Sequence, residues 1–155
     1  MKTTAPTSLR YLEDLEPGEL YVSEPVTLTQ QDIVDFARAY DPQAMHVDPE
    51  QAASGPFKGL IASGWHVAAL AMRLSVDSRM FGGTPIIGAG VDELRWLHPV
   101  RPGDALTLER TLVGIEPPKH QKGRGTVKSL MVMRNQAGDV VLQMTAIAKV
   151  PVRPS

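Results

Sequence analysis

Residues 59–76 read GLIASGWHVAALAMRLSV and decide the fold of this chain. The segment is the most apolar of the sequence, but His66 and Arg73 interrupt it, which favours a buried helix over a membrane span. Five of its residues keep the spacing of a helix: Trp65, Ala68, Ala69, Met72 and Val76. Alanines at positions 62, 68, 69 and 71 make this helix thin, so that a sheet can approach it closely. We therefore predict that the central helix of the fold lies here and begins near Gly64.

The chain before this helix contains one predicted strand. Residues 20–28, LYVSEPVTL, are rich in β-formers, although Pro25 restricts the strand to an edge or a bend. Residues 1–18 end in Pro-Gly and are expected to form an irregular lead-in. No repeat or low-complexity segment divides the sequence, so residues 1–155 are expected to form a single domain.

Two shorter helices are expected between that strand and the central helix. Thr29 and Asp32 resemble a capping box, and the helix that they open ends at Asp41, because Pro42 pushes the residue before it out of the helical region. Asp48 followed by a proline is a typical start of a second, short helix. The stretch between these two helices is not expected to be helical.

Everything after residue 85 predicts β-structure. The expected strands cover residues 86–98, 105–116, 125–135 and 139–150. The segments RPGD at 101–104 and QAGD at 136–139 have the composition of turns. One strand, then helices, then a run of antiparallel strands predicts an α+β domain with a helix packed on one face of a sheet.

Composition excludes several classes of function. The chain of 155 residues has no cysteine, which excludes disulfides, thiolate zinc sites and cysteine nucleophiles. Its net charge of −1 argues against a general electrostatic attraction to nucleic acid or to an anionic membrane. The four histidines share no metal-ligand spacing, so no metal site is predicted. The N-terminal residues lack the apolar run of a signal peptide, and a cytoplasmic protein is expected.

The segment AYDPQAMHVDPE, residues 39–50, contains the main candidates for chemistry. Asp41 and His46 could be a helix stop and a solvated loop histidine, and their spacing alone favours this interpretation. A sharply turning loop could instead direct both side chains at one water, as a general base and a general acid. The residues alone leave both interpretations open.

Other candidates also have two interpretations. Gly64 is either a close-packing glycine or an unpaired N–H donor for an oxyanion at the start of the central helix. Ser63 has no nucleophile elbow around it, which disfavours a serine hydrolase. His66 is expected to be half-buried, and could line a pocket. A basic loop is either solvated surface or a contact for phosphate groups, through Lys119, Lys122 and Arg124.

Two long segments of the chain resemble a known family. Residues 36–74, FARAYDPQAMHVDPEQAASGPFKGLIASGWHVAALAMRL, and residues 93–112, ELRWLHPVRPGDALTLERTL, are similar to the MaoC-like dehydratase, or (R)-specific enoyl-CoA hydratase, family. The resemblance extends from about Leu20 to Val150. It implies a hot-dog fold, in which a curved antiparallel sheet wraps round one long helix, and a homodimer or a larger homo-oligomer.

The resemblance implies that Asp41 and His46 are the catalytic pair and that the Gly64 amide binds the thioester oxygen. The implied reaction is reversible syn addition of water to a trans-2-enoyl-CoA, giving a (3R)-3-hydroxyacyl-CoA. It needs no metal and no cofactor beyond the coenzyme A of the substrate. Here Gln43-Ala44 replaces the family's Asn-Pro, and Ser63 replaces the histidine before the helix glycine.

Substrate contacts are therefore expected from residues beside the pair and from the basic loop, namely Gln43, Ser63, Trp65, Lys119, Lys122 and Arg124. Two other functions on the same fold stay open. One is an acyl-CoA thioesterase, which would also use a carboxylate and a helix N-terminus. The other is a non-catalytic acyl-CoA-binding module.

Overall fold

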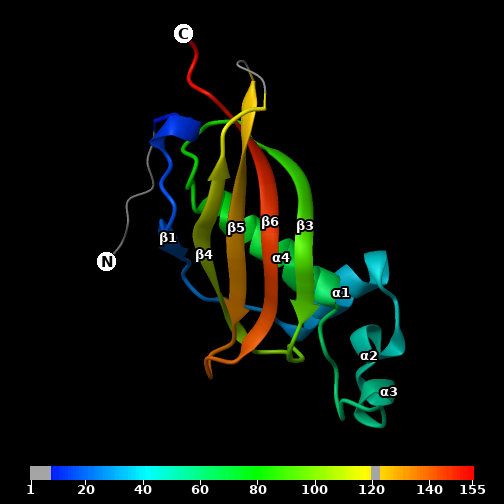
Figure 1. The fold of residues 1–155 in the computed structure, drawn as a ribbon. Coiled ribbons are helices and arrows are strands. Elements are labelled where there is room, and N and C mark those ends of the chain that lie inside the picture. The colour runs from blue at the N-terminus through cyan, green and yellow to red at the C-terminus, as the bar shows by residue number, and fades with distance from the viewer. Residues whose placement is uncertain (1–7, 120–122) are drawn as a thin grey trace.

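The structure, a computed structural model, describes residues 8–119 and 123–155. A six-stranded antiparallel sheet curves round one long helix, and three shorter helices lie beyond one end of that helix (Figure 1). The strands are β1 (Leu20–Val22), β2 (Val26–Thr27), β3 (Ile87–Trp96), β4 (Ala105–Glu116), β5 (Arg124–Arg134) and β6 (Val140–Pro151). The helices are the 3-10 helix η1 (Leu12–Asp14), α1 (Gln30–Tyr40), α2 (Ala44–Val47), α3 (Pro49–Ala53) and α4 (Gly64–Asp77). The predicted α+β class and hot-dog arrangement are confirmed.

The sheet has the order β1-β4-β5-β6-β3, and β2 pairs with β4 beside β1. The main core lies between α4 and the inner face of the sheet, where Leu106, Leu108, Met131 and Met133 are almost fully buried. Burial of apolar side chains on the inner face of each strand supplies most of the stabilisation of such a layer. The strands predicted over residues 105–116 and 125–135 are thus confirmed.

Local sequence signals set the element boundaries as predicted. Thr29 Oγ1 accepts a hydrogen bond from the Asp32 N–H at 3.1 Å, and Asp32 Oδ2 accepts one from the Thr29 N–H at 2.9 Å. Asp48 caps α3 by accepting bonds from the next two free N–H groups, at residues 50 and 51. Gly103 has a φ of +88°, as the third position of a type II turn requires.

Two predicted elements differ in detail. The strand expected over residues 20–28 is divided into β1 and β2, because the chain bends at Ser23–Pro25. The lead-in is more ordered than expected over its described part, since η1 places Leu12 against Gly125 of β5. Leu12 and Leu15 are both buried, together with Val127 and other residues of the sheet, in a second apolar cluster.

Helix α4 is present as predicted, but most of the apolar stripe that predicts it faces away from the sheet, while Ala68 packs against the core. Val67, Ala71 and Leu74 form the face that packs on the sheet. Trp65, Met72 and Val76 lie on the other side, and each is more than half exposed in the single chain. The small alanine at position 71 allows the close approach of the sheet, while the outer side retains an apolar surface.

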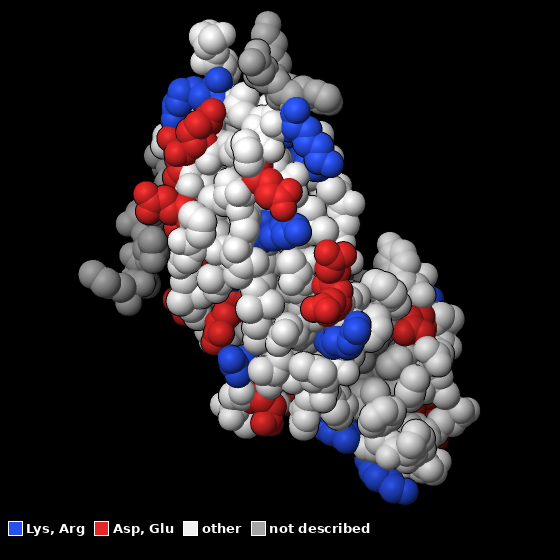
Figure 2. All heavy atoms as spheres, in the orientation of Figure 1, with Lys and Arg blue, Asp and Glu red and all other residues white. Residues whose placement is uncertain are grey.

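Strand β3 is one of the two edges of the sheet. Among the described residues it pairs only with β6, and every residue of β3 except Leu94 is exposed. A bulge lies between Asp92 and Arg95, where Glu93 has a φ of +53°. On the sheet face seen in Figure 2, acidic and basic side chains are interspersed, without a large patch of one sign.

Candidate active site

The turn from α1 to α3 brings Asp41 and His46 together. Asp41 is the C-cap of α1, and its N–H donates to the carbonyl oxygen of Ala37 at 2.8 Å. Residues 44–47 were expected to be non-helical, but they form the single helical turn α2, which contains His46. This turn places Nε2 of His46 3.4 Å from Oδ2 of Asp41.

Three side chains surround the Asp41 carboxylate. Gln43 Nε2 donates to Oδ1 at 2.7 Å, and Ser63 Oγ donates to Oδ2 at 2.7 Å. These hydrogen bonds, that from Gln43 first, together with the nearby His46 ring, lower the pKa of Asp41 against the opposing effect of burial. Asp41 is consequently ionised at neutral pH.

The orientation of the His46 ring is fixed by the main chain. The side chain is only 4% exposed, and Nδ1 lies 2.8 Å from the carbonyl oxygen of Ile61. A carbonyl oxygen can only accept, so Nδ1 carries the proton in the neutral ring. Nε2 is then an acceptor, and it faces the Asp41 carboxylate. Two neighbouring acceptors at the cavity wall can both accept from one molecule that donates twice, such as water.

The start of α4 forms the next part of the site. Ser63 is the N-cap and is fully buried, but its hydroxyl bonds to Asp41 instead of capping its own helix. The Gly64 N–H donates no hydrogen bond to any residue in 8–119 or 123–155. A free N–H at the first turn of a 14-residue helix is a donor for developing negative charge, and the helix dipole has the right sign.

Trp96, at the end of β3, covers Gly64. Its indole Nε1 donates to the Gly64 carbonyl oxygen at 2.8 Å, and its ring contacts that of Trp65 edge-on with centroids 5.1 Å apart. A Cβ atom at position 64 would lie 2.4 Å from Trp96 Cε2. Only glycine therefore fits at position 64 while Trp96 stays in place.

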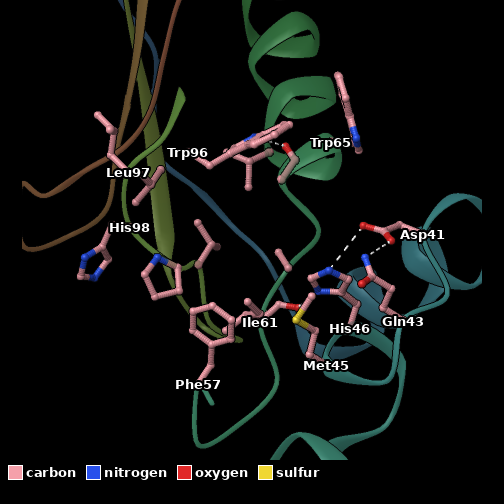
Figure 3. A pocket seen from close by; sticks show the side chains of 16 residues that line it. Asp41, Gln43, Met45, His46, Phe57, Ile61, Trp65, Trp96, Leu97 and His98 are labelled. Carbon is pink, nitrogen blue, oxygen red and sulfur yellow. Dashed lines mark hydrogen bonds and ion pairs between the residues drawn. The ribbon is translucent and has the colours of Figure 1, made fainter. Parts of the chain in front are cut away.

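These residues line a cavity of about 530 Å³ (Figure 3). Asp41, Gln43 and His46 lie on one side, and Trp96 and Leu97 lie across from them. The rest of the lining is mainly apolar and consists of Met45, Phe57, Ile61, Ala62, Gly64, Trp65, Val67, His98, Pro99, Val100 and Val141. A few polar groups in an apolar cavity are typical of a site for a small molecule with a reactive polar part.

The structure does not bring every predicted residue to this cavity. Trp65 and Gln43 line it, whereas the buried Ser63 reaches only Asp41. Lys119 and Arg124 belong to the hairpin between β4 and β5, at the opposite end of the sheet from α2 and α3 in Figure 1. Arg124 donates to the main-chain oxygens of Pro85 and Lys149. Lys122 lies outside the described residues.

His66 has a structural environment. Its ring stacks on Phe36 with centroids 4.5 Å apart and does not line the cavity. Burial lowers its pKa, with Asp32 opposing, and Nδ1 has no partner among the described residues. Sequence reasoning missed two contributors, the Ile61 carbonyl and Trp96. The first is a main-chain atom without any sequence signal, and the second had been assigned only to a strand.

No group of three or more acidic or histidine side chains in residues 8–119 and 123–155 is arranged to bind a metal ion. Within the same ranges, none of the helices has both the length and the apolar character needed to cross a bilayer.

The chain is similar to known proteins in both sequence and fold. The family model described as "MaoC like domain" matches residues 14–133. A 3-hydroxyacyl-thioester dehydratase Z of Mycobacterium tuberculosis is 38% identical over 69% of this chain and 70% of its own length. An (R)-specific enoyl-CoA hydratase of Rhodospirillum rubrum is 28% identical over 94% of each chain.

A crystal structure of a MaoC-like dehydratase from Rhodospirillum rubrum is similar throughout. It superposes with a TM-score of 0.85 at 42% sequence identity, covering 94% of this chain and 99% of the other. Family model, relatives and fold agree, and the chain belongs to the MaoC-like dehydratase domain family.

Proposed function

We propose that this protein is an acyl-thioester hydratase/dehydratase that adds water reversibly to a trans-2-enoyl-CoA to give a (3R)-3-hydroxyacyl-CoA. One observation carries the proposal: an ionised Asp41 and the acceptor Nε2 of His46 face each other across 3.4 Å at the wall of an apolar cavity. We place the reaction in the cytoplasm. The relatives named above are a 3-hydroxyacyl-thioester dehydratase and an enoyl-CoA hydratase, which supports the same class of reaction.

The hydrogen-bond pattern assigns different tasks to the pair. A water that donates to both Asp41 Oδ2 and His46 Nε2 would present its oxygen to the β-carbon of the substrate. Because the pKa of Asp41 is lowered, the carboxylate polarises the water without retaining a proton. The proton passes to Nε2, and the imidazolium beside Asp41 then delivers it to the α-carbon. Oxygen and proton therefore reach the same face of the double bond.

The helix start completes the proposed site. Negative charge moves to the thioester oxygen as the new C–O bond forms, and the free Gly64 N–H can donate to that oxygen. Removal of such a donor commonly slows a reaction about 100- to 1,000-fold. The thioester carbonyl makes the β-carbon electrophilic, so water addition requires only positioning, charge stabilisation and proton transfer.

A homodimer through β3 is part of the proposal. The edge of β3 has unpaired main-chain groups, and an apolar surface that includes Trp65, Met72 and Val76 lies beside it on α4. An exposed edge and an exposed apolar face of this kind favour pairing with a second copy. Antiparallel pairing of two β3 strands about a twofold axis would extend the sheet across both subunits.

The test measures loss of the enoyl-thioester absorbance with crotonyl-CoA and longer trans-2-enoyl-CoAs. We expect the wild type to form 3-hydroxyacyl-CoA and Asp41→Asn to lose roughly 100- to 10,000-fold in kcat. Asp48→Asn is the matched control, since asparagine caps a helix as well as aspartate does. Release of free CoA would instead indicate a thioesterase, and saturable binding without turnover would indicate a binding module.

A further inference from the structure

A second cavity contains a buried cation that the proposed reaction does not use. Arg110 is on β4, at a position that faces inward between Leu108 and Leu112, and it is only 4% exposed. Burial lowers its pKa to about 10, so the guanidinium is still charged at neutral pH. A buried charge is costly unless a partner of opposite sign compensates it.

The partners of Arg110 are neutral. Nε donates to Ser129 Oγ at 3.2 Å, Nη1 donates to Ser75 Oγ, and the guanidinium carbon lies 4.8 Å from the centre of the Phe81 ring. No carboxylate among residues 8–119 and 123–155 forms an ion pair with it. The serines fix the plane of the guanidinium but leave its charge unneutralised.

The free edge of the guanidinium remains accessible. Nη2 has no hydrogen-bond partner in the described part of the chain. Within the same part, His66 Nδ1 is the only fully buried side-chain nitrogen or oxygen that lacks a hydrogen-bond partner. Nη2 of Arg110 also lacks a partner, so it is not fully buried and retains access to the cavity. Three N–H groups, two on Nη2 and one on Nη1, are then available to an acceptor.

The cavity has a volume of about 420 Å³ and lies between the C-terminal half of α4 and the N-terminal half of β3. Its walls are largely apolar and include Met72, Val76, Val91 and Ile147. Arg79 adds a second positive charge, and the lining contains no acidic residue. An apolar chamber with a fixed cation matches a ligand with an apolar chain and one anionic end.

We propose that Arg110 binds the carboxylate of a ligand whose remaining part is a short apolar chain. A carboxylate can accept two parallel N–H bonds from a guanidinium, and the apolar walls fit a hydrocarbon chain better than a strongly hydrated phosphate. The inference assigns a new binding site, with Arg110 as the recognition group and Ser75 and Ser129 as the residues that position it.

Two sources could supply this carboxylate. One is a free short-chain acid. The other is the far end of a dicarboxylic acyl thioester, and this version rests on the proposed hydratase function. Ser75 lies roughly 17 Å along α4 from Gly64, so the two cavities of one chain are separate. If two β3 strands pair about a twofold axis, the N-terminal half of one strand lies beside the C-terminal half of the other. This cavity would then lie beside Trp96 of the second copy, at the proposed active site of that copy.

The first arm of the test measures binding without catalysis. Titration with hexanoate, followed by NMR, should shift resonances of residues that line the cavity, whereas hexanol should not. Arg110→Met should weaken hexanoate binding roughly 10- to 100-fold. Arg134→Met is the matched control, since Arg134 bonds to Glu109 and lines neither cavity. Arg110→Lys keeps the charge without the planar donor pair, and should bind with intermediate affinity.

The second arm compares trans-2-hexenedioyl-CoA with trans-2-hexenoyl-CoA as substrates. If the carboxylate belongs to the acyl group, Arg110→Met lowers kcat/KM roughly 10- to 100-fold for the first substrate and leaves the second unchanged. A loss in the hexanoate arm alone identifies the free acid as the source. The proposal is overturned if both folded Arg110 variants keep the wild-type affinity for hexanoate and the wild-type kcat/KM for both thioesters. It is also overturned if kcat/KM falls equally for both thioesters.

The two proposals fail separately. Hydration of crotonyl-CoA without any Arg110-dependent binding would retain the hydratase and remove the carboxylate site. Arg110-dependent binding of hexanoate, with no hydration of any enoyl-CoA, would retain the carboxylate site and remove the hydratase.

Discussion

The Ser63 hydroxyl donates to the Asp41 carboxylate at 2.7 Å, although the two residues belong to different helices. An N-cap serine ordinarily bonds to its own helix, and here that bond is absent. The end of α1 and the start of α4 are thus joined through the carboxylate that we place in the reaction.

Loss of either donor should raise the pKa of Asp41. We expect the larger rise in Gln43→Ala and the smaller in Ser63→Ala, because the Gln43 bond is the main cause of the lowered pKa. The measurement is an NMR titration of the labelled Asp41 carboxyl carbon in each variant. An unchanged pKa in both variants would contradict the hydrogen-bond assignment.

The same shift has a consequence for stability. A carboxyl group with a lowered folded-state pKa stabilises the fold above its unfolded pKa, near 3.9, and loses this contribution as the pH falls through the folded value. Gln43→Ala should therefore lose less stability than the wild type over the same acid range. Urea unfolding at a series of pH values between neutrality and strong acid measures this difference.

Gly64→Ala should be destabilising because of Trp96. The new methyl group would overlap the indole, and overpacking of this kind costs about 1–3 kcal/mol. In a Trp96→Ala background the clash disappears, so the same substitution should cost less, and a double-mutant cycle from urea unfolding gives the coupling. Gly114→Ala is the control, since its Cβ would make only an ordinary contact with Lys128 at 3.6 Å. Additive effects would show that Trp96 does not restrict position 64.

Ile87→Glu should prevent assembly through β3. Ile87 is 53% exposed on the free edge strand, and a carboxylate there would be buried without a partner on pairing. Val113→Glu introduces the same charge at an exposed site on β4, where no pairing is expected. Light scattering should show a dimer for the wild type and Val113→Glu, and a monomer for Ile87→Glu. A wild-type monomer would contradict the proposed interface.

A contact between the basic loop and coenzyme A phosphates stays a prediction. Lys119→Ala should raise KM for an enoyl-CoA with little change in kcat, because the contact would be equal in the ground and transition states. Since the loop lies at the opposite end of the sheet from α2 and α3 in the same chain, such a contact would be made to a second copy. The rise in KM should then disappear in Ile87→Glu, if that monomer retains activity.

Sequence periodicity was sufficient to predict most of the fold. Capping pairs and turns act through neighbouring residues, so Thr29–Asp32 and the turn at 101–104 were predicted within a residue or two. The exposed side of α4 was not predictable in this way. An apolar stripe at helical spacing indicates a helix, but the spacing does not indicate whether the stripe packs on the sheet of the same chain or on another molecule.

The site was only partly predictable. The spacing of Asp41 and His46 did not favour catalysis, and resemblance to a family changed that judgement. The Ile61 carbonyl and the Ser63 bond depend on how the start of α4 meets α1, which no local pattern encodes. Arg110 did carry a signal, since it interrupts the inward-facing series of Leu106, Leu108 and Leu112 with a charge.

Residues 41–64 contain the proposed catalytic pair, both donors to Asp41, the carbonyl that orients His46 and the free helix N–H. Among the described residues of the sheet, only Trp96 forms a hydrogen bond to these site residues, through the Gly64 carbonyl oxygen. These polar groups therefore come from one continuous segment of the chain. Exchanging it for the matching segment of a relative would replace every hydrogen bond around the carboxylate in one step, while the strands that form the hydrophobic core keep their own sequence.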